Sequence, residues 1–102
     1  LLILGQRQQC RVEGLSMFPT LKEGDIVIYK PYKESTTRIN VGQLIIAKNP
    51  IETNKLIIKR VSGTEVNGVT LTGDNLSLST DSRHYGRVNF SKVIGLAEEL
   101  SK

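Results

Sequence analysis

Ser16 is the first residue of the sequence whose surroundings suit chemistry. It lies in residues 14–21, Gly-Leu-Ser-Met-Phe-Pro-Thr-Leu. Pro19 fixes its own backbone angle and disfavours helix at Phe18, so we predict a rigid, non-helical turn with one hydroxyl at its tip. Gly14 frees the backbone to approach neighbouring groups closely. The turn suits a nucleophile with a base beside it, but Ser and Pro are also ordinary turn residues, and both interpretations stay open at this point.

A candidate base lies in residues 56–61, Leu-Ile-Ile-Lys-Arg-Val. Side chains alternate along a strand, so Ile57, Lys59 and Val61 are expected to share one face. Burial between two β-branched side chains would lower the pKa of the lysine, because burial disfavours the charged form. A neutral amine can act as a general base near neutral pH. A lysine that extends to solvent is the alternative.

A third segment, residues 73–86, is dense in hydroxyl groups and carries Asp81 and Arg83 two positions apart. These groups can organise a local network of hydrogen bonds and ion pairs. His84 is the only histidine, and a triad of Ser16, His84 and Asp81 is conceivable. Arg83 would compete for the carboxylate in that triad, so we favour Lys59 as the base.

Taken together, the three segments resemble one known family. Ser-Met-x-Pro-Thr-Leu-x-x-Gly-Asp at 16–25, Lys-Arg-Val at 59–61 and Gly-Asp-Asn-x-x-x-Ser-x-Asp-Ser-Arg-x-x-Gly at 73–86 closely resemble the motif boxes of the type I signal peptidase family, in order and in spacing. The resemblance covers about residues 12–95. It implies a serine endopeptidase with a Ser/Lys dyad and with neither a metal nor another cofactor.

The resemblance also implies a role for each motif residue. Ser16 matches the nucleophile and Lys59 the general base. The oxyanion hole would consist of backbone donors near Gly14 and Ser16, and the substrate would bind as an extended strand on an exposed sheet edge. The family prefers small residues just before the cut. The residues expected to support the dyad are Ser79, Asp81, Arg83 and Arg60.

The substrate class is less sharply indicated. Only 13 residues, 60–72, separate Lys59 from Gly73, where larger signal peptidases carry an extra β-domain. The 73–86 segment most resembles the nickel-type superoxide dismutase maturation proteases, which predicts a cytoplasmic enzyme that removes an N-terminal extension from that precursor. The alternative is a membrane-tethered signal peptidase or inner-membrane peptidase whose anchor precedes Leu1.

Two other classes fit the sequence less well. An autocleaving repressor domain shares the dyad but carries a cleavage segment upstream, commonly Ala-Gly or Cys-Gly; here 15 residues precede Ser16, and Cys10 is followed by Arg11. A basic β-barrel that binds nucleic acid would not explain why Ser16, Lys59 and Asp81 occur together in these motifs. The net charge of +4 is spread along the chain, and aromatic residues make up only 5%, which is few for base stacking.

The elements that must position these residues are predicted to be short strands in one all-β, barrel-like or coiled-sheet domain over the 102 residues. One cysteine excludes an internal disulfide and a Cys-based zinc cluster, and no run of 18 apolar residues occurs.

Asn67-Gly68 predicts a hairpin. Residues 33–40 and 76–84 are expected to be loops, 98–102 could form one helical turn, and 1–8 could be the remnant of an N-terminal extension. The predicted strands cover residues 10–13, 25–29, 43–48, 56–61, 69–72 and 91–97.

Overall fold

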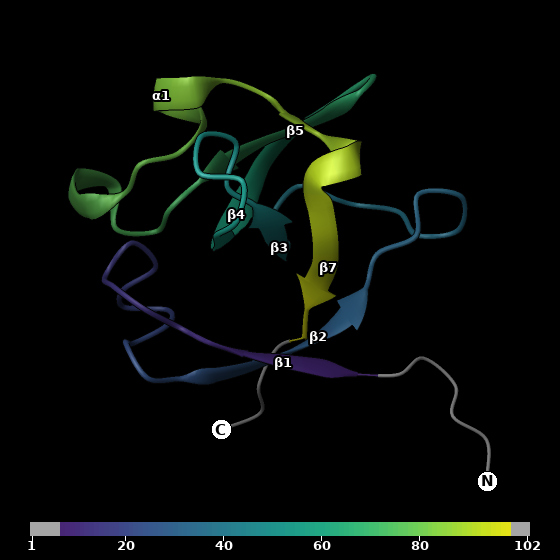
Figure 1. Ribbon diagram of the computed structural model, residues 1–102. Coiled ribbons are helices and arrows are strands. Elements are labelled where there is room, and N and C mark those ends of the chain that lie inside the picture. Colours follow the sequence, from purple (N-terminus) through teal and green to yellow (C-terminus); the bar gives the residue numbers. More distant parts are fainter. Residues whose placement is uncertain (1–6, 99–102) are drawn as a thin grey trace, which may run out of the picture.

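The computed structural model describes residues 7–98, which form one curled antiparallel sheet of seven strands in the order β1-β2-β7-β3-β4-β5-β6. Figure 1 shows the curl, with β1 and β2 at the bottom of the view and β5 at the top. This confirms the predicted all-β coiled-sheet domain. The strands are β1 (Gln8–Arg11), β2 (Ile26–Pro31), β3 (Leu44–Lys48), β4 (Leu56–Glu65), β5 (Gly68–Thr72), β6 (Val88–Asn89) and β7 (Val93–Ala97).

The polar segment after β5 differs from its prediction. It contains the 3-10 helix η1 (Leu76–Leu78) and the helix α1 (Ser82–Tyr85), where the sequence suggested a loop. Asp81 caps α1, because its side chain accepts from the backbone N–H of Arg83. A further 3-10 helix, η2 (Phe90–Lys92), occupies the predicted start of β7. Residues 1–6 and 99–102 lie outside the described part of the chain, and with them most of the expected N-terminal remnant and C-terminal turn.

The predicted hairpin is confirmed, but its glycine serves another purpose. Glu65 pairs with Gly68, so Val66 and Asn67 form the connection between β4 and β5. Gly68 has an ordinary negative φ and belongs to β5, and a Cβ atom there would lie 2.2 Å from the carbonyl oxygen of Val88. The glycine therefore permits close pairing of β5 with β6.

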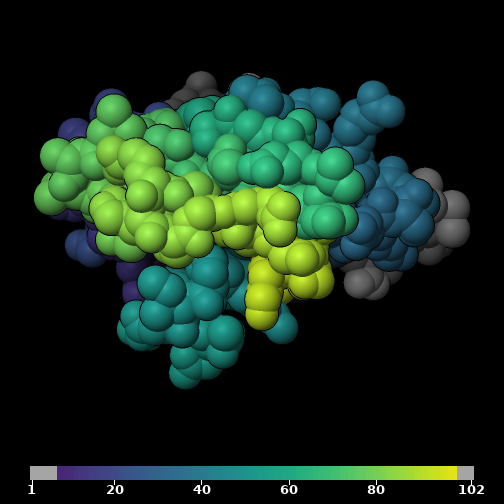
Figure 2. All heavy atoms as spheres, turned by 90° about the horizontal axis from the view of Figure 1, so that it is seen from above, coloured from purple at the N-terminus to yellow at the C-terminus, as the bar shows by residue number. Residues whose placement is uncertain are grey.

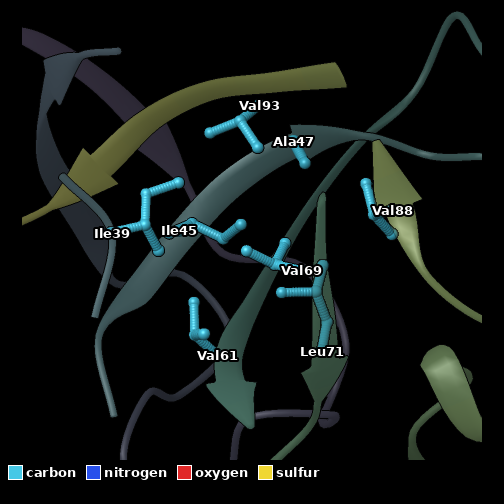
Figure 3. Packing of buried hydrophobic residues seen from close by; sticks show 8 residues of the cluster. All are labelled: Ile39, Ile45, Ala47, Val61, Val69, Leu71, Val88 and Val93. Carbon is cyan, nitrogen blue, oxygen red and sulfur yellow. The ribbon is translucent and has the colours of Figure 1, made fainter. Parts of the chain in front are cut away.

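The curled sheet encloses one apolar cluster and carries a second on its other face. Figure 3 shows the first cluster gathered between the strands; it consists of Ile39, Ile45, Ala47, Val61, Val69, Leu71, Val88 and Val93. The second cluster contains Met17 and Leu21, which are 1% and 8% exposed, so the turn that carries Ser16 is anchored in the core. Burial of each such side chain stabilises the fold by roughly 1.5–3 kcal/mol.

The space-filling view shows the loop between β3 and β4, in teal, projecting from the body of the protein (Figure 2). Ile51 in this loop is 69% exposed, and Lys55 forms an exposed ion pair with Glu52. The same loop leads directly into the first residues of β4, which line the pocket described next.

Candidate active site

An open pocket of about 400 Å³ brings the two predicted catalytic residues together. Ser16 and Lys59 both line it, although they come from distant parts of the chain. One wall is formed by the end of β1 and the residues that follow it, and the other by the start of β4. The lining residues are Cys10, Arg11, Val12, Glu13, Ser16, Ile46, Lys55, Leu56, Ile57, Ile58 and Lys59.

Ser16 is half-buried on a non-helical turn, as predicted. The turn is closed by hydrogen bonds from the Phe18 N–H to the Leu15 carbonyl (3.1 Å) and from the Leu21 N–H to the Met17 carbonyl (2.9 Å). Gly14 has a φ of +78°, which favours glycine, while a Cβ atom there would meet nothing within 4 Å. Gly14 is thus required for its backbone angle and not, as the sequence suggested, for a close approach.

Lys59 is buried, with 5% of its surface exposed, and its ammonium donates to the hydroxyl of Ser79 at 3.0 Å. Burial lowers the pKa of Lys59, and this outweighs the opposing attraction of Asp81; the positive charge of Arg83 lowers the pKa further. The buried position confirms the alternation predicted for residues 57–61. A lysine that releases its proton more readily than usual suits a general base.

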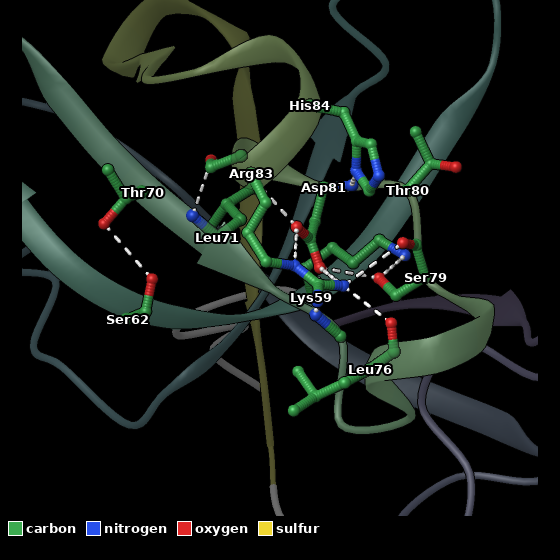
Figure 4. Close-up of polar contacts among 12 residues, drawn as sticks. Lys59, Ser62, Thr70, Leu71, Leu76, Ser79, Thr80, Asp81, Arg83 and His84 are labelled. Carbon is green, nitrogen blue, oxygen red and sulfur yellow. Dashed lines mark hydrogen bonds and ion pairs between the residues drawn. The ribbon is translucent and has the colours of Figure 1, made fainter.

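Asp81 is fully buried and forms the centre of the network that holds Ser79 (Figure 4). It accepts hydrogen bonds from Ser79 Oγ (2.8 Å), from the Gly73 N–H (2.9 Å) and from Arg83 Nε (2.9 Å). Burial raises the pKa of Asp81, but these donors together outweigh it and hold the pKa well below its usual range. Asp81 is therefore ionised, and it orients the hydroxyl that contacts Lys59.

Arg60 supports a second ion pair. Its Nε and Nη2 atoms donate to the two carboxylate oxygens of Asp74 at 2.9 and 2.8 Å, and its Nη1 donates to the Gly42 carbonyl at 2.7 Å. Thr20 donates to the same carboxylate at 2.5 Å. The family resemblance implied that Arg60 supports the dyad; these bonds join it to Asp74, the residue after Gly73.

Of the two candidate oxyanion donors, the N–H of Gly14 is already hydrogen-bonded and, in the described part of the chain, that of Ser16 is not. The Gly14 N–H donates to Glu23 Oε1 at 3.0 Å, so it can bind an oxyanion only if Glu23 moves away. Within residues 7–98 the Ser16 N–H has no hydrogen-bond acceptor. The backbone N–H of Ser16 is therefore the better candidate of the two.

His84 does not complete a triad. Its side chain is exposed, and its Nδ1 atom accepts from the Asp81 N–H at 3.3 Å as part of a capping box. In a triad that nitrogen would instead donate to the carboxylate. The geometry assigns His84 to the capping box of α1, and Lys59 remains the candidate base.

Sequence reasoning gave no role to Asp74 and Asn75, which hold the turn that carries Ser16 (residues 14–21), the turn of the candidate nucleophile. The Asn75 N–H donates to the Ser16 carbonyl (2.8 Å), and the Asn75 side-chain amide donates to the Leu15 carbonyl (3.0 Å). The Asp74 N–H contacts the sulfur of Met17 at 3.4 Å. Both residues lie in the 73–86 motif, and their position there was the only available signal.

No group of three or more His, Cys, Asp or Glu side chains in residues 7–98 could hold a metal ion. None of the helices described is long and apolar enough to cross a membrane.

The sequence was compared with known proteins. The family model described as signal peptidase, peptidase S26, matches residues 2–71, which is more than half of the chain. The chain belongs to this family. The matched region contains Ser16 and Lys59 and ends before the 73–86 motif.

Curated relatives of the chain are mitochondrial proteases. The chain is 29% identical over 109 residues to the mitochondrial ATP-independent inner membrane protease subunit 1a of Arabidopsis thaliana, covering 84% of this chain and 65% of the relative. It is 33% identical over 102 residues to the mitochondrial inner membrane protease subunit 1 of Mus musculus and to that of Homo sapiens, covering 80% of this chain and 61% of each relative. The chain thus spans less than two thirds of the length of these relatives.

Proposed function

We propose that this chain is the catalytic part of a serine endopeptidase that cuts an N-terminal extension from a precursor protein by means of Ser16 and Lys59. The observation that carries the proposal is the buried amine of Lys59, which shares a pocket with Ser16 and is held by Ser79. Membership of the signal peptidase family supports the same reaction.

The reaction would run in two halves. Neutral Lys59 takes the proton of the Ser16 hydroxyl while the serine oxygen attacks the scissile carbonyl, and the Ser16 N–H stabilises the resulting oxyanion. The protonated lysine then gives its proton to the departing amine, which leaves an acyl-enzyme. Lys59 next takes a proton from water, the hydroxide attacks the ester, and the serine leaves with that proton.

The pocket offers two strand edges to an extended substrate. In β4, Leu56 to Lys59 pair with β3 on one side, whereas pairing with β5 on the other side begins only at Arg60. Within the described residues, β1 pairs only with β2. Both edges face the pocket, so a peptide between them can form backbone hydrogen bonds and present its scissile bond to Ser16.

The relatives favour a membrane-associated enzyme. Their names support the alternative of a membrane-tethered peptidase over the cytoplasmic maturation of nickel superoxide dismutase. Exposed apolar side chains in and beside the turn that carries Ser16 also suit a membrane surface. Leu15 and Phe18 are 49% and 44% exposed, and Leu76 and Leu78 in the neighbouring η1 are 57% and 59% exposed. We therefore propose precursors presented at a membrane as the substrate class. The resemblance of the 73–86 motif keeps the nickel superoxide dismutase precursor as the second candidate.

One experiment separates the candidates. The protein is incubated with a membrane-targeted preprotein that has small residues before its cleavage site, and with a nickel superoxide dismutase precursor, and the cuts are mapped by mass spectrometry. We expect cleavage of the first, loss of cleavage in Ser16→Ala and Lys59→Ala, and normal cleavage in the control Ser35→Ala, which alters an exposed loop serine. Cleavage of the second precursor alone would overturn the membrane assignment, and cleavage that survives Ser16→Ala would overturn the dyad.

A further inference from the structure

The two peptide groups that flank the nucleophile are both held by Asn75. Its backbone N–H donates to the Ser16 carbonyl at 2.8 Å, and its side-chain Nδ2 donates to the Leu15 carbonyl at 3.0 Å. The orientation of the side-chain amide is fixed as well, because its Oδ1 accepts from Ser77 Oγ at 3.2 Å. Asn75 therefore binds the nucleophile turn through two donors with defined directions.

The direction of the Leu15 carbonyl determines the direction of the Ser16 N–H. Both belong to one planar peptide unit, in which a trans bond makes the C=O and N–H point in opposite directions. The cis peptide of the turn lies at Phe18–Pro19 and not here. A donor that holds the Leu15 carbonyl on the side of Asn75 thus turns the Ser16 N–H to the opposite side.

The same contact also strengthens the N–H as a donor. A hydrogen bond to the carbonyl end of a peptide group polarises its N–H end. The Leu15 carbonyl accepts from both Asn75 Nδ2 and the Phe18 N–H, while the Ser16 N–H has no acceptor within residues 7–98. The arrangement leaves this N–H oriented and unused.

We propose that Asn75 is a positioning residue that aims the Ser16 N–H at the oxyanion of the reaction. The role rests on the proposed function and adds a residue to it. Close packing supports it independently: a Cβ atom on the neighbouring Gly73 would lie 2.7 Å from the Ser16 carbonyl oxygen, so this segment lies directly against the nucleophile.

Two substitutions separate the side-chain donor from the rest of Asn75. Asn75→Ala removes the amide but keeps the backbone N–H. Asn75→Asp keeps the shape and places a carboxylate oxygen against the Leu15 carbonyl, which repels it. Asn89→Ala is the matched control, because the Asn89 side chain also forms a hydrogen bond with the backbone, but it accepts from the Ser91 N–H and does so beside η2.

The readout is kcat per active site. The number of active sites is measured by titration at a saturating concentration of a peptide boronic acid that forms a tetrahedral adduct on Ser16. Loss of a whole oxyanion donor costs about 10²–10³-fold in kcat. A misaimed donor still stabilises the oxyanion in part, so we expect kcat to fall by about 10–100-fold in Asn75→Ala. The fall should be larger in Asn75→Asp. KM should stay within about twofold, because the strand edges that bind the substrate are unchanged. Affinity for the boronic acid should fall in parallel with kcat/KM.

The outcomes are distinct. A purely structural role would lower the fraction of titratable sites and leave kcat per site within twofold of the wild type, which would overturn the proposal. A loss confined to KM, or an equal loss in Asn89→Ala, would overturn it too. A wild-type protein that cleaves no precursor would overturn the proposed function itself, whereas an active wild type with normal Asn75 variants would overturn only the role of Asn75.

Discussion

Replacing Lys59 with methionine is expected to abolish cleavage and, at the same time, to stabilise the fold. Lys59 is 5% exposed, and the desolvation that lowers its pKa is stronger than the attraction of Asp81 that opposes it. Methionine has a similar length and no charge, so it removes the cost of burying an ionisable group while it keeps the packing. The proposed base is thus a site where function is retained at the expense of stability.

The magnitude follows from what the lysine contacts. Its hydrogen bond to Ser79, 3.0 Å long, is lost at a cost of about 1 kcal/mol. Replacing buried charged groups with well-packed apolar ones of similar volume is often neutral or stabilises by about 1–4 kcal/mol. Asp81 retains the bonds from Ser79, Gly73 and Arg83, so no carboxylate is left unpaired. We expect a net gain of about 1–2 kcal/mol, which raises Tm by about 4–8 °C per kcal/mol in a domain near this size.

The gain should depend on pH in a defined direction. In the unfolded chain Lys59 has its ordinary pKa of 10.5, and in the folded protein its pKa is lower. As the pH falls below 10.5, the unfolded state takes up the proton first, so the wild type loses stability until the pH reaches the folded pKa. The advantage of Lys59→Met should therefore grow as the pH falls from 10.5 and then level off.

Urea denaturation at pH 7 and pH 10, with cleavage assays on the same samples, provides the test. Lys30→Met serves as the control, because Lys30 is exposed on β2; its stability should stay within about 0.5 kcal/mol of the wild type. The reasoning is refuted if Lys59→Met is less stable than the wild type at pH 7, if its advantage is larger at pH 10, or if it still cleaves.

Three further predictions concern the groups around the dyad. Gly73→Ala should lower kcat at least tenfold and destabilise the fold by about 1–3 kcal/mol, because its Cβ atom would lie 2.2 Å from Ser79 Oγ and 2.7 Å from the Ser16 carbonyl; kinetics and urea denaturation check both. His84→Ala should keep most activity and lose about 0.5–1.5 kcal/mol of stability with the hydrogen bond from the Asp81 N–H; loss of activity in a folded variant would restore the triad. The specificity constant kcat/KM should rise with pH through the lowered pKa of Lys59, the proposed base, and a profile that falls over that range would contradict a neutral amine as the base.

The strands could be predicted from the sequence because their signals are local. Alternation in residues 56–61 placed Lys59 on the same face as Val61, and the structure shows that this face is buried, with Lys59 paired to Ile45 beside the core. The hairpin at Asn67-Gly68 was likewise found. Its glycine, however, is required by the close pairing with β6, which lies twenty residues later in the chain. No local sequence pattern indicates that contact.

The contacts that hold the site could not be predicted because they are distant in sequence. Asn75 contacts Leu15 across 60 positions, and Asp74 contacts Thr20 across 54. The motifs identified the region but not the contacts within it, so Arg60 was expected to support the dyad while its bidentate contact with Asp74 was not foreseen. Residues 76–84 were predicted to form a loop because η1 and α1 are too short to show helical periodicity.

One closed loop contacts both halves of the proposed dyad. Asn75 donates to the Ser16 carbonyl at one end of it, and Ser79 accepts from Lys59 at the other, while Asp81 joins the two ends by accepting from the Gly73 N–H at 2.9 Å. Ser16 and Lys59 themselves share no hydrogen bond within residues 7–98. The loop thus contacts both residues of the proposed dyad, and since a displacement of about 1 Å can cost about 10²-fold in rate, a change that breaks the bond between Asp81 and Gly73 should impair the nucleophile and the base together.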